Sequence, residues 1–408
     1  MEISAHDNKE ALRKERFYIL ILSAIQIIHI LDFVIMMPLG PRFMRVFQIN
    51  PAEFSFLVSA YTFSAGIVGF FGALYADHFD RKKFLMFNFT GFLIGTYMCA
   101  VAPNYPALLF ARIFAGAFGG VLNACVLSMV ADLIPFHRRG AAMGVIMSAF
   151  SISSVLGVPL GLYVAQIFDW HAAFYLIVIV GSIIWILALM ILPSINVRTK
   201  NLNVKENLKN FQQILCQKDY LQSFLLTSVL GFGVFMIVPF IATYMVGNVG
   251  LTEAQLPFIY LIGGTCTIIS ARIIGKACDR IGSYRVFKFV AFASIIPIFL
   301  LTNLPHVPLV FALMSSSLFM MSGSGRFIPA MTIISAVVKP QERGTFMSLE
   351  NAARQLSSGV ASQLAGLIIG VGAAGALTNY NIVGYFGIAT SLLAIFIAFK
   401  IKTKFNLR

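Results

Sequence analysis

Asp32 is an acidic side chain deep inside a long apolar run. Counted from residue 17, where the run begins, it lies about 22 Å along the predicted helix. A carboxylate at that depth is costly unless it takes up a proton or faces a polar cavity. We therefore predict a proton-carrying site at Asp32. A fixed ion pair with an arginine is the alternative.

Arg112 and His29 could act on the same proton. Arg112 lies about 9 Å inside the outer end of its own apolar run and could reach toward Asp32. His29 stands one helical turn before Asp32 and could relay protons, since an imidazole titrates near neutral pH. A neutral histidine that is hydrogen-bonded inside the protein is the other interpretation of His29.

A second polar group of residues falls on one face of a predicted helix near the C-terminus. Its spacing of i, i+3, i+4, i+7 and i+11 predicts that this face lines a central cavity, because lipid would reject it. Its members are Asn351, Arg354, Gln355, Ser358 and Ser362. Glu350 is a second candidate for proton coupling, although an intrahelical pair with Arg354 would also explain it. Arg326 lies at a depth similar to that of Arg354 and is expected in the same cavity.

The ionisable residues of the apolar runs carry a positive balance. Asp32 and Glu350 stand against arginines in the ratio of two to four, the arginines being Arg112, Arg272, Arg326 and Arg354. This balance argues against a dedicated exporter of polycations. It favours an anionic, zwitterionic or neutral amphipathic substrate, unless the arginines are structural.

Twelve apolar runs dominate the sequence, which is 59% hydrophobic and 11% charged. Runs of about 20 residues cross a bilayer as helices. We predict an all-α membrane protein with twelve transmembrane helices in two pseudo-symmetric six-helix bundles. The runs span residues 17–40, 54–76, 84–102, 106–134, 140–167, 172–194, 220–247, 255–279, 284–303, 306–338, 344–372 and 381–401.

The two halves repeat each other with an offset of 201 to 204 residues. Asp32-x5-Pro38 matches Gly233-x5-Pro239, Asp77 matches Asp279, and Arg139-Gly140 matches Arg343-Gly344. Duplicated halves built from apolar segments are typical of secondary transporters, which rock one half against the other around a central site. The boundaries are a tail at 1–16, bundles at 17–194 and 220–401, a linker at 195–219 and a tail at 402–408.

Basic residues gather in every second loop, and Arg42 and Arg45 are the only ones in the intervening loops. By the positive-inside rule, both termini and the linker are cytoplasmic, in a multi-pass protein of the plasma (inner) membrane. The net charge of +14 therefore indicates contact with anionic lipid and no nucleic acid. The linker carries an apolar stripe suited to lying on the bilayer surface. Its members are Val204, Leu208, Phe211 and Leu215.

The sequence has no pattern for hydrolytic or metal chemistry. The five cysteines show no CxxC pairing, so we expect neither a disulfide nor a metal site, and we expect no cofactor. Phosphate-loop, zinc-protease and serine-hydrolase motifs are absent from the sequence. We predict that the protein is no enzyme and that any transport is driven by a gradient.

Two turns resemble the loop signature of the major facilitator superfamily. They run from Ala73 through Asp77 to Arg81, and from Gly275 through Asp279 and Arg280 to Gly282. The second copy matches the family pattern better, which predicts unequal turns. The resemblance implies that Asp77, Arg81, Asp279 and Arg280 belong to a conformational gate.

Three further segments are similar to the drug:proton antiporter branch of that family. They are Leu31-Asp32 to Pro41, Arg112-x-x-x-Gly116, and Gly157-Val-Pro159-Leu-Gly161. The last is similar to the motif of bacterial sugar-efflux and arabinose-efflux members, and adds Gly157, Pro159 and Gly161 to the expected gate as a close-packed, bendable seam.

The resemblance implies a monomeric transporter that works by alternating access. We expect proton-coupled efflux of a small amphipathic molecule, such as a drug or a sugar-like compound, in exchange for protons. A proton-linked importer, or a lysolipid or organic-anion transporter, is the nearer alternative. A membrane receptor or scaffold that transports nothing is the more distant one.

Overall fold

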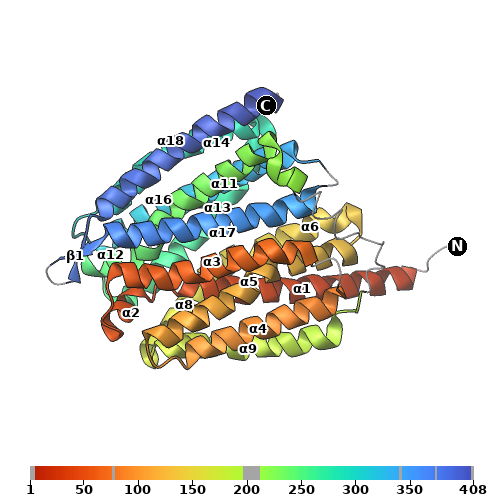
Figure 1. The fold of residues 1–408 in the computed structure, drawn as a ribbon, viewed down its shortest axis with the longest axis horizontal. Coiled ribbons are helices and arrows are strands. Elements are labelled where there is room, and N and C mark those ends of the chain that lie inside the picture. The colour runs from red at the N-terminus through yellow and green to blue at the C-terminus, as the bar shows by residue number, and fades with distance from the viewer. Residues whose placement is uncertain (1–4, 76–78, 196–211, 340–341, 373–374, 406–408) are drawn as a thin grey trace.

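The computed structural model describes residues 5–75, 79–195, 212–339, 342–372 and 375–405 (Figure 1). Asp77, most of the linker and three members of its apolar stripe, Val204, Leu208 and Phe211, therefore lie outside the described residues. Within the described part the chain is almost entirely helical. The exception is a two-stranded antiparallel hairpin in which Gly370 pairs with Thr378.

The N-terminal bundle contains the elements up to residue 195. They are α1 (Ala5–Ile35), α2 (Gly40–Val46), α3 (Pro51–Tyr75), α4 (Arg81–Ala100), α5 (Tyr105–Leu133), α6 (Phe136–Met147), α7 (Ala149–Ile152), the π-helix η2 (Ser153–Gly157), α8 (Val158–Ile167) and α9 (Trp170–Ile191). Helix α1 starts twelve residues before the predicted span and ends at Ile35, so Pro38 lies in a turn. A proline there fits, because it cannot donate to a continuing helix.

The C-terminal bundle follows the linker. Its elements are α11 (Lys218–Ile237), the 3-10 turns η3 (Val238–Phe240) and η4 (Glu253–Gln255), α12 (Ile241–Gly247), α13 (Leu256–Ile281), α14 (Ser283–Ala293), α15 (Ile295–Thr302), α16 (Leu309–Val337), α17 (Arg343–Ile368), β1 (Gly370–Val371), β2 (Leu377–Thr378) and α18 (Tyr380–Phe405).

Nine helical segments of the described residues are long and apolar enough to cross a membrane. Helices α4, α16 and α17 have 20, 29 and 26 residues, which is also enough to span a bilayer, although their polar residues lower the mean hydropathy. The exact number of twelve membrane spans stays a prediction.

The bundles lie side by side along α3 and α17, which run next to each other through the middle of the molecule (Figure 1). Both chain termini lie at one end of the bundles, here called the terminal end. Helix α2 and the β1–β2 hairpin lie at the other, here called the opposite end (Figure 1). The bundles lie closer together at the opposite end and spread apart toward the terminal end in this view.

Short polar residues set where several helices begin. Asn104 precedes α5 and accepts a hydrogen bond from the amide of Ala107 at 3.0 Å. Asp169 precedes α9 and accepts from the amides of His171 and Ala172. Each side chain satisfies amides that the first helical turn leaves unpaired. These caps fix the helix ends and therefore the depth of the residues within each helix.

Candidate functional site

Asp32 and Arg112 form an ion pair inside the N-terminal bundle. The Arg112 NH1 group donates to Oδ2 of Asp32 at 2.8 Å, and both side chains are fully buried. Helix α1 supplies the acid and α5 supplies the base. A pair shielded from water in this way interacts far more strongly than one at the surface. The two residues that sequence reasoning placed together are therefore in contact.

The ion pair is surrounded by few other polar partners. The guanidinium carbon of Arg112 lies 4.4 Å from the centre of the Tyr61 ring on α3. Among the described residues, Nε and NH2 of Arg112 and Oδ1 of Asp32 have no hydrogen-bond partner. Cys99 of α4 lies beside the same guanidinium. Loss or gain of one charge here would therefore find little local compensation.

Glycines let α3 and α5 approach closely enough to form this site. A Cβ atom on Gly116 would lie 2.4 Å from the main-chain oxygen of Tyr61, and one on Gly120 would lie 2.2 Å from that of Ala65. No larger residue fits either position without moving the backbone. The glycine of the Arg112-x-x-x-Gly116 pattern thus has a direct packing role.

His29 lies one turn from Asp32, but its ring makes no hydrogen bond with a described residue. Both ring nitrogens are buried, and the ring packs edge-on against Phe92 at a centroid distance of 5.6 Å. Its Nε2 atom lies 3.1 Å from where a Cβ of Gly119 would be. The histidine therefore belongs to the same buried region without bonding to the acid.

The polar face of α17 is divided between two environments. Arg354 has a side chain that is 31% exposed, and it donates to Oδ1 of Asn351 at 2.6 Å. Its Nε atom lies 3.8 Å from Glu350, which is almost fully buried. Gln355 is half-buried. This part of the helix presents one accessible guanidinium.

The outer part of that face packs against other helices. Ser358 is fully buried, and its Oγ lies 3.1 Å from where a Cβ of Gly231 on α11 would be. Ser362 is also buried and donates to the main-chain oxygen of Ser55 on α3 at 3.4 Å. The expected cavity lining is therefore limited to the region around Asn351, Arg354 and Gln355.

Arg326 lies apart from Arg354. Its side chain is buried inside the C-terminal bundle, where its NH1 donates to the hydroxyl of Ser391 on α18. The expectation that these two arginines face one cavity is corrected by this placement. Helical rise gives a residue's depth, but the direction of its side chain depends on how the helix is rotated in the bundle.

The two repeated turns differ, in line with their sequences. Gly282 ends α13 with φ at 93°, a conformation that favours glycine. Asp80 instead caps α4, accepting from the amide of Lys83 at 2.9 Å and from the hydroxyl of Ser194 at 2.7 Å. Arg81 pairs with Asp132 at 3.0 Å. Asp279 and Arg280 are exposed and make no ion pair within the part of the chain that is described.

The Gly157-Val-Pro159-Leu-Gly161 segment lies at a π-turn but not at the boundary between the bundles. A Cβ on Gly157 would lie 2.8 Å from Leu31, and one on Gly161 would lie 2.9 Å from Ile35, both on α1 of the same bundle. The expected seam between the halves is corrected in this respect. The boundary glycine is Gly264 of α13, whose Cβ would lie 2.7 Å from Val155.

Glu253 joins the two bundles at the opposite end. Its carboxylate pairs with Arg45 at 2.6 Å and lies 3.7 Å from Arg42. Its main-chain oxygen accepts from Gln166 at 2.9 Å. Sequence reasoning missed this residue. The signal was present in Arg42 and Arg45, the two basic residues that depart from the charge pattern of the loops.

At the terminal end, the ion pairs between described residues stay within one bundle. Arg138 pairs with Glu15 at 2.9 Å in the N-terminal bundle, and Lys404 pairs with Asp219 in the C-terminal bundle. Charge therefore holds the bundles together at the opposite end only, so far as the described residues show.

Comparison with known proteins agrees with this architecture. The family model described as Major Facilitator Superfamily matches residues 22–362 and 224–405. The chain belongs to the major facilitator superfamily. Its fold and family are those of multi-pass membrane transporters of small molecules.

Relatives within the major facilitator superfamily are distant in sequence. The uncharacterized MFS-type transporter YceJ of Bacillus subtilis (strain 168) is 23% identical over 365 residues, which cover 89% of each chain. Multidrug resistance protein 2 of the same strain is 22% identical and covers 72% of this chain and 75% of its own. Identity at this level supports the family and leaves the substrate open.

Solved structures of the family share the fold. A D-xylose-proton symporter superposes with a TM-score of 0.75 at 16% identity, covering 93% of this chain and 96% of its own. A bacterial homolog of the human lysosomal transporter Spinster, inward-facing and unoccupied, gives 0.70 at 15% identity, covering 96% and 98%. These likenesses concern the fold alone.

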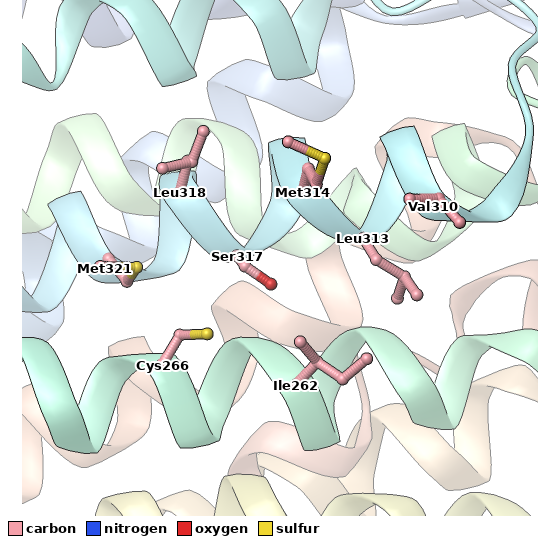
Figure 2. Close-up of a pocket in the computed structure, with 8 residues that line it drawn as sticks. All are labelled: Ile262, Cys266, Val310, Leu313, Met314, Ser317, Leu318 and Met321. Atoms are coloured by element: carbon pink, nitrogen blue, oxygen red, sulfur yellow. The ribbon is translucent and has the colours of Figure 1, made fainter.

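An apolar groove lies between α13 and α16, away from the ion pair (Figure 2). Its volume is about 390 Å³, and its lining residues are Ile262, Cys266, Val310, Leu313, Met314, Ser317, Leu318 and Met321. Val310 and Met314 are 63% and 57% exposed, as expected for side chains facing lipid. With no charged residue in its lining, the groove has no means of handling a proton.

Proposed function

We propose that this protein is a secondary active transporter that works by alternating access, with Asp32 as the acid that carries the coupling proton. The buried Asp32–Arg112 pair is the observation that carries this proposal. Protonation of Asp32 would remove the counter-charge of a fully buried arginine. Leaving such a charge unpaired is worth about 3–5 kcal/mol in proteins, which is enough to bias a large conformational change.

The two-bundle architecture supports the mechanical part of the proposal. The bundles are joined by Glu253 at the opposite end, while ion pairs between described residues at the terminal end stay within one bundle. In alternating access, such a state is closed on one side of the membrane, and breaking the closure exposes the site to the other side. With both termini in the cytoplasm, the closed side would be the outer one.

Export in exchange for protons is the direction we favour. The helix 5 segment from Gly157 to Gly161 resembles an efflux motif, and relatives such as multidrug resistance protein 2 carry efflux-type names. The partly exposed Arg354 suits a substrate with an anionic or hydrogen-bond-accepting group. Asp32, Arg112 and Glu350 would handle protons, and Asn351, Arg354 and Gln355 would contact the substrate.

Import is the second candidate, since the D-xylose-proton symporter shares the fold. Transport measured in vesicles of both orientations under an imposed proton gradient separates the two directions. Exchange of internal substrate for external protons supports export, and co-movement supports import. Purified protein that moves neither substrate nor protons would indicate a receptor or scaffold.

A thermal-shift screen identifies the substrate and tests the proton site together. The purified protein is heated with sugars, lipids, organic anions and cationic drugs at two pH values. We expect the stabilisation by the true ligand to depend on pH in the wild type and to lose that dependence in Asp32→Asn. Asp169→Asn, a capping acid at the opposite end, is the matched control. If Asp32→Asn keeps the wild-type dependence, the coupling assignment is wrong.

A further inference from the structure

Arg112 is held from two sides that respond differently to a proton. One side is the Asp32 carboxylate, 2.8 Å from NH1. The other is the face of the Tyr61 ring, whose centre is 4.4 Å from the guanidinium carbon. An aromatic face attracts a cation through its quadrupole, most strongly where water is absent. Protonation of Asp32 removes the first attraction and leaves the second.

The ring of Tyr61, and not its hydroxyl, explains why a tyrosine is placed here. The side chain is 1% exposed, and its hydroxyl has no hydrogen-bond partner among the described residues. A buried tyrosine hydroxyl normally finds a partner. The hydroxyl instead lies 2.3 Å from where a Cβ of Gly119 would be, so the missing side chain of that glycine makes room for it.

A row of three rings runs from the arginine to the other bundle. Phe33, the residue after Asp32, packs against Tyr61 with a centroid distance of 5.2 Å and an interplanar angle of 30°. On its other side Phe33 packs against Phe235 of α11 at 5.8 Å and 31°. We call Tyr61, Phe33 and Phe235 the aromatic bridge. It joins the ion pair to the C-terminal bundle.

We propose that Tyr61 is a positioning residue for the ion pair, and that the aromatic bridge passes the protonation state of Asp32 to the C-terminal bundle. This inference rests on the proposed role of Asp32. When the carboxylate takes up a proton, the guanidinium settles against the Tyr61 ring alone. Because the interior is close-packed, a shift of that ring moves Phe33 and its contact with Phe235.

Other groups that titrate also face the ion pair and must be separated from it. They are His29 on α1, Cys99 on α4 and Tyr61 itself on α3, together with Arg112 on α5. The variant Asp32→Asn removes the acid and leaves these groups in place. Any pH response that survives in it comes from them.

The test follows the distance between the bundles as the pH changes. Spin labels are attached to cysteines at Gly140 and Gly344, which hold matching positions in the two halves, with Cys216→Ser removing the exposed native cysteine. Nothing lies within 4 Å of a Cβ at either glycine, so the labels fit. The full-length protein is measured in lipid nanodiscs from pH 5 to 9.

We expect the wild type to change distance with a defined pH midpoint and Asp32→Asn to lose that change. Tyr61→Phe keeps the ring and should keep the midpoint. Tyr61→Leu should lower the midpoint by about one pH unit, because the unsupported arginine then holds the carboxylate charged to lower pH. Phe235→Leu should keep the midpoint but shrink the distance change at least twofold.

Phe54 and Phe240 provide the matched control for the bridge. They also meet across the bundles, at 5.7 Å, and neither contacts the ion pair. Phe240→Leu should therefore leave both the midpoint and the distance change as in the wild type. The inference is overturned if Tyr61→Leu matches the wild type, or if Phe235→Leu and Phe240→Leu behave alike, while Asp32→Asn still abolishes the response. A response that persists in Asp32→Asn overturns the proposed function as well.

Discussion

Asp80 and Gly282 hold equivalent positions in the two repeated turns and start the next helix by different means. Glycine reaches a backbone conformation with φ at 93° that places the chain for α14. Asp80 has φ at −55° and uses its carboxylate to hold the first amides of α4. One turn is therefore set by backbone freedom and the other by a charge. Only the second should respond to pH.

The Asp80 carboxylate should make stability depend on acid pH. Burial by itself would raise the pKa of Asp80. Hydrogen bonds from the Lys83 amide and the Ser194 hydroxyl, together with the charge of Lys83, outweigh burial and hold that pKa below its usual value. A lowered folded-state pKa gives stability that is present above the unfolded value, near 3.9, and is lost as the pH falls through the folded value.

We expect Asp80→Ala to lower the free energy of unfolding by about 0.5–1 kcal/mol at pH 7, since the site is largely exposed. Thermal unfolding of purified protein from pH 7 to pH 3 measures this. The gap to wild type should narrow below about pH 4, where the wild type loses the charge. Asp80→Ser keeps a capping oxygen and should be milder at every pH. A gap that stays constant down to pH 3 would contradict the assignment.

Single residues show where sequence reasoning reaches its limit. Asp32 and Arg112 could be placed together because charges inside a membrane protein must find partners. Arg326 could not be placed, because its depth follows from helical rise while its direction follows from the packing of α16 against α18. The role of Tyr61 was equally hidden. One aromatic residue among 39 phenylalanines and 13 tyrosines gives no signal of its own.

At the scale of elements, small residues decide which helices touch. Gly264 lets α13 approach η2, and Gly366 lets α17 approach α3, where a Cβ would lie 2.5 Å from the Cβ of Ser55. Both contacts join the two bundles. The sequence predicted a glycine seam in helix 5, and the structure places that seam within one bundle. Glycine spacing alone does not say which neighbour approaches.

The contact of Glu253 with α2 should control opening at the opposite end. Glu253→Gln removes the charge that holds Arg45 at 2.6 Å and leaves the main-chain bond to Gln166 in place. A partly exposed pair is worth up to about 1 kcal/mol, so the open population should rise up to about fivefold. Spin labels at Val46 and Val310, exposed positions in different bundles, report the distance.

Asp169→Asn is the control for that measurement. It removes an ion pair of 3.0 Å with His171 at the same end but within one bundle. Its distance distribution should match the wild type. Equal opening in both variants would show that any loss of charge at this end loosens the protein, and Glu253 would then have no special part in closure.

At the scale of the whole molecule, the internal repeat was the most reliable guide. An offset of about 200 residues predicted two bundles, and the family and fold agree with that division. The repeat could not predict that the bundles would differ in their buried charges. Asp32 of the first half has Gly233 as its counterpart, so only the N-terminal bundle holds an acid at this position.

Rocking of two rigid bundles predicts that one covalent link between them stops transport. A Cβ on Gly264 would lie 3.4 Å from the Cβ of Ser154, close to the separation found in disulfides. We expect the double variant Ser154→Cys, Gly264→Cys to lose transport at least tenfold on oxidation and to recover it with reductant. Uptake of the screened ligand into proteoliposomes is the measurement.

A link inside one bundle separates immobilisation from damage. A Cβ on Gly233 of α11 would lie 3.3 Å from the Cβ of Thr390 on α18, so Gly233→Cys with Thr390→Cys gives a bridge of the same geometry within the C-terminal bundle. A bundle that moves as one body tolerates this bridge, and transport should persist after oxidation. If the inner link stops transport as fully as the link between bundles, the bundles do not move as rigid units. Motion within each bundle would then have to carry the cycle.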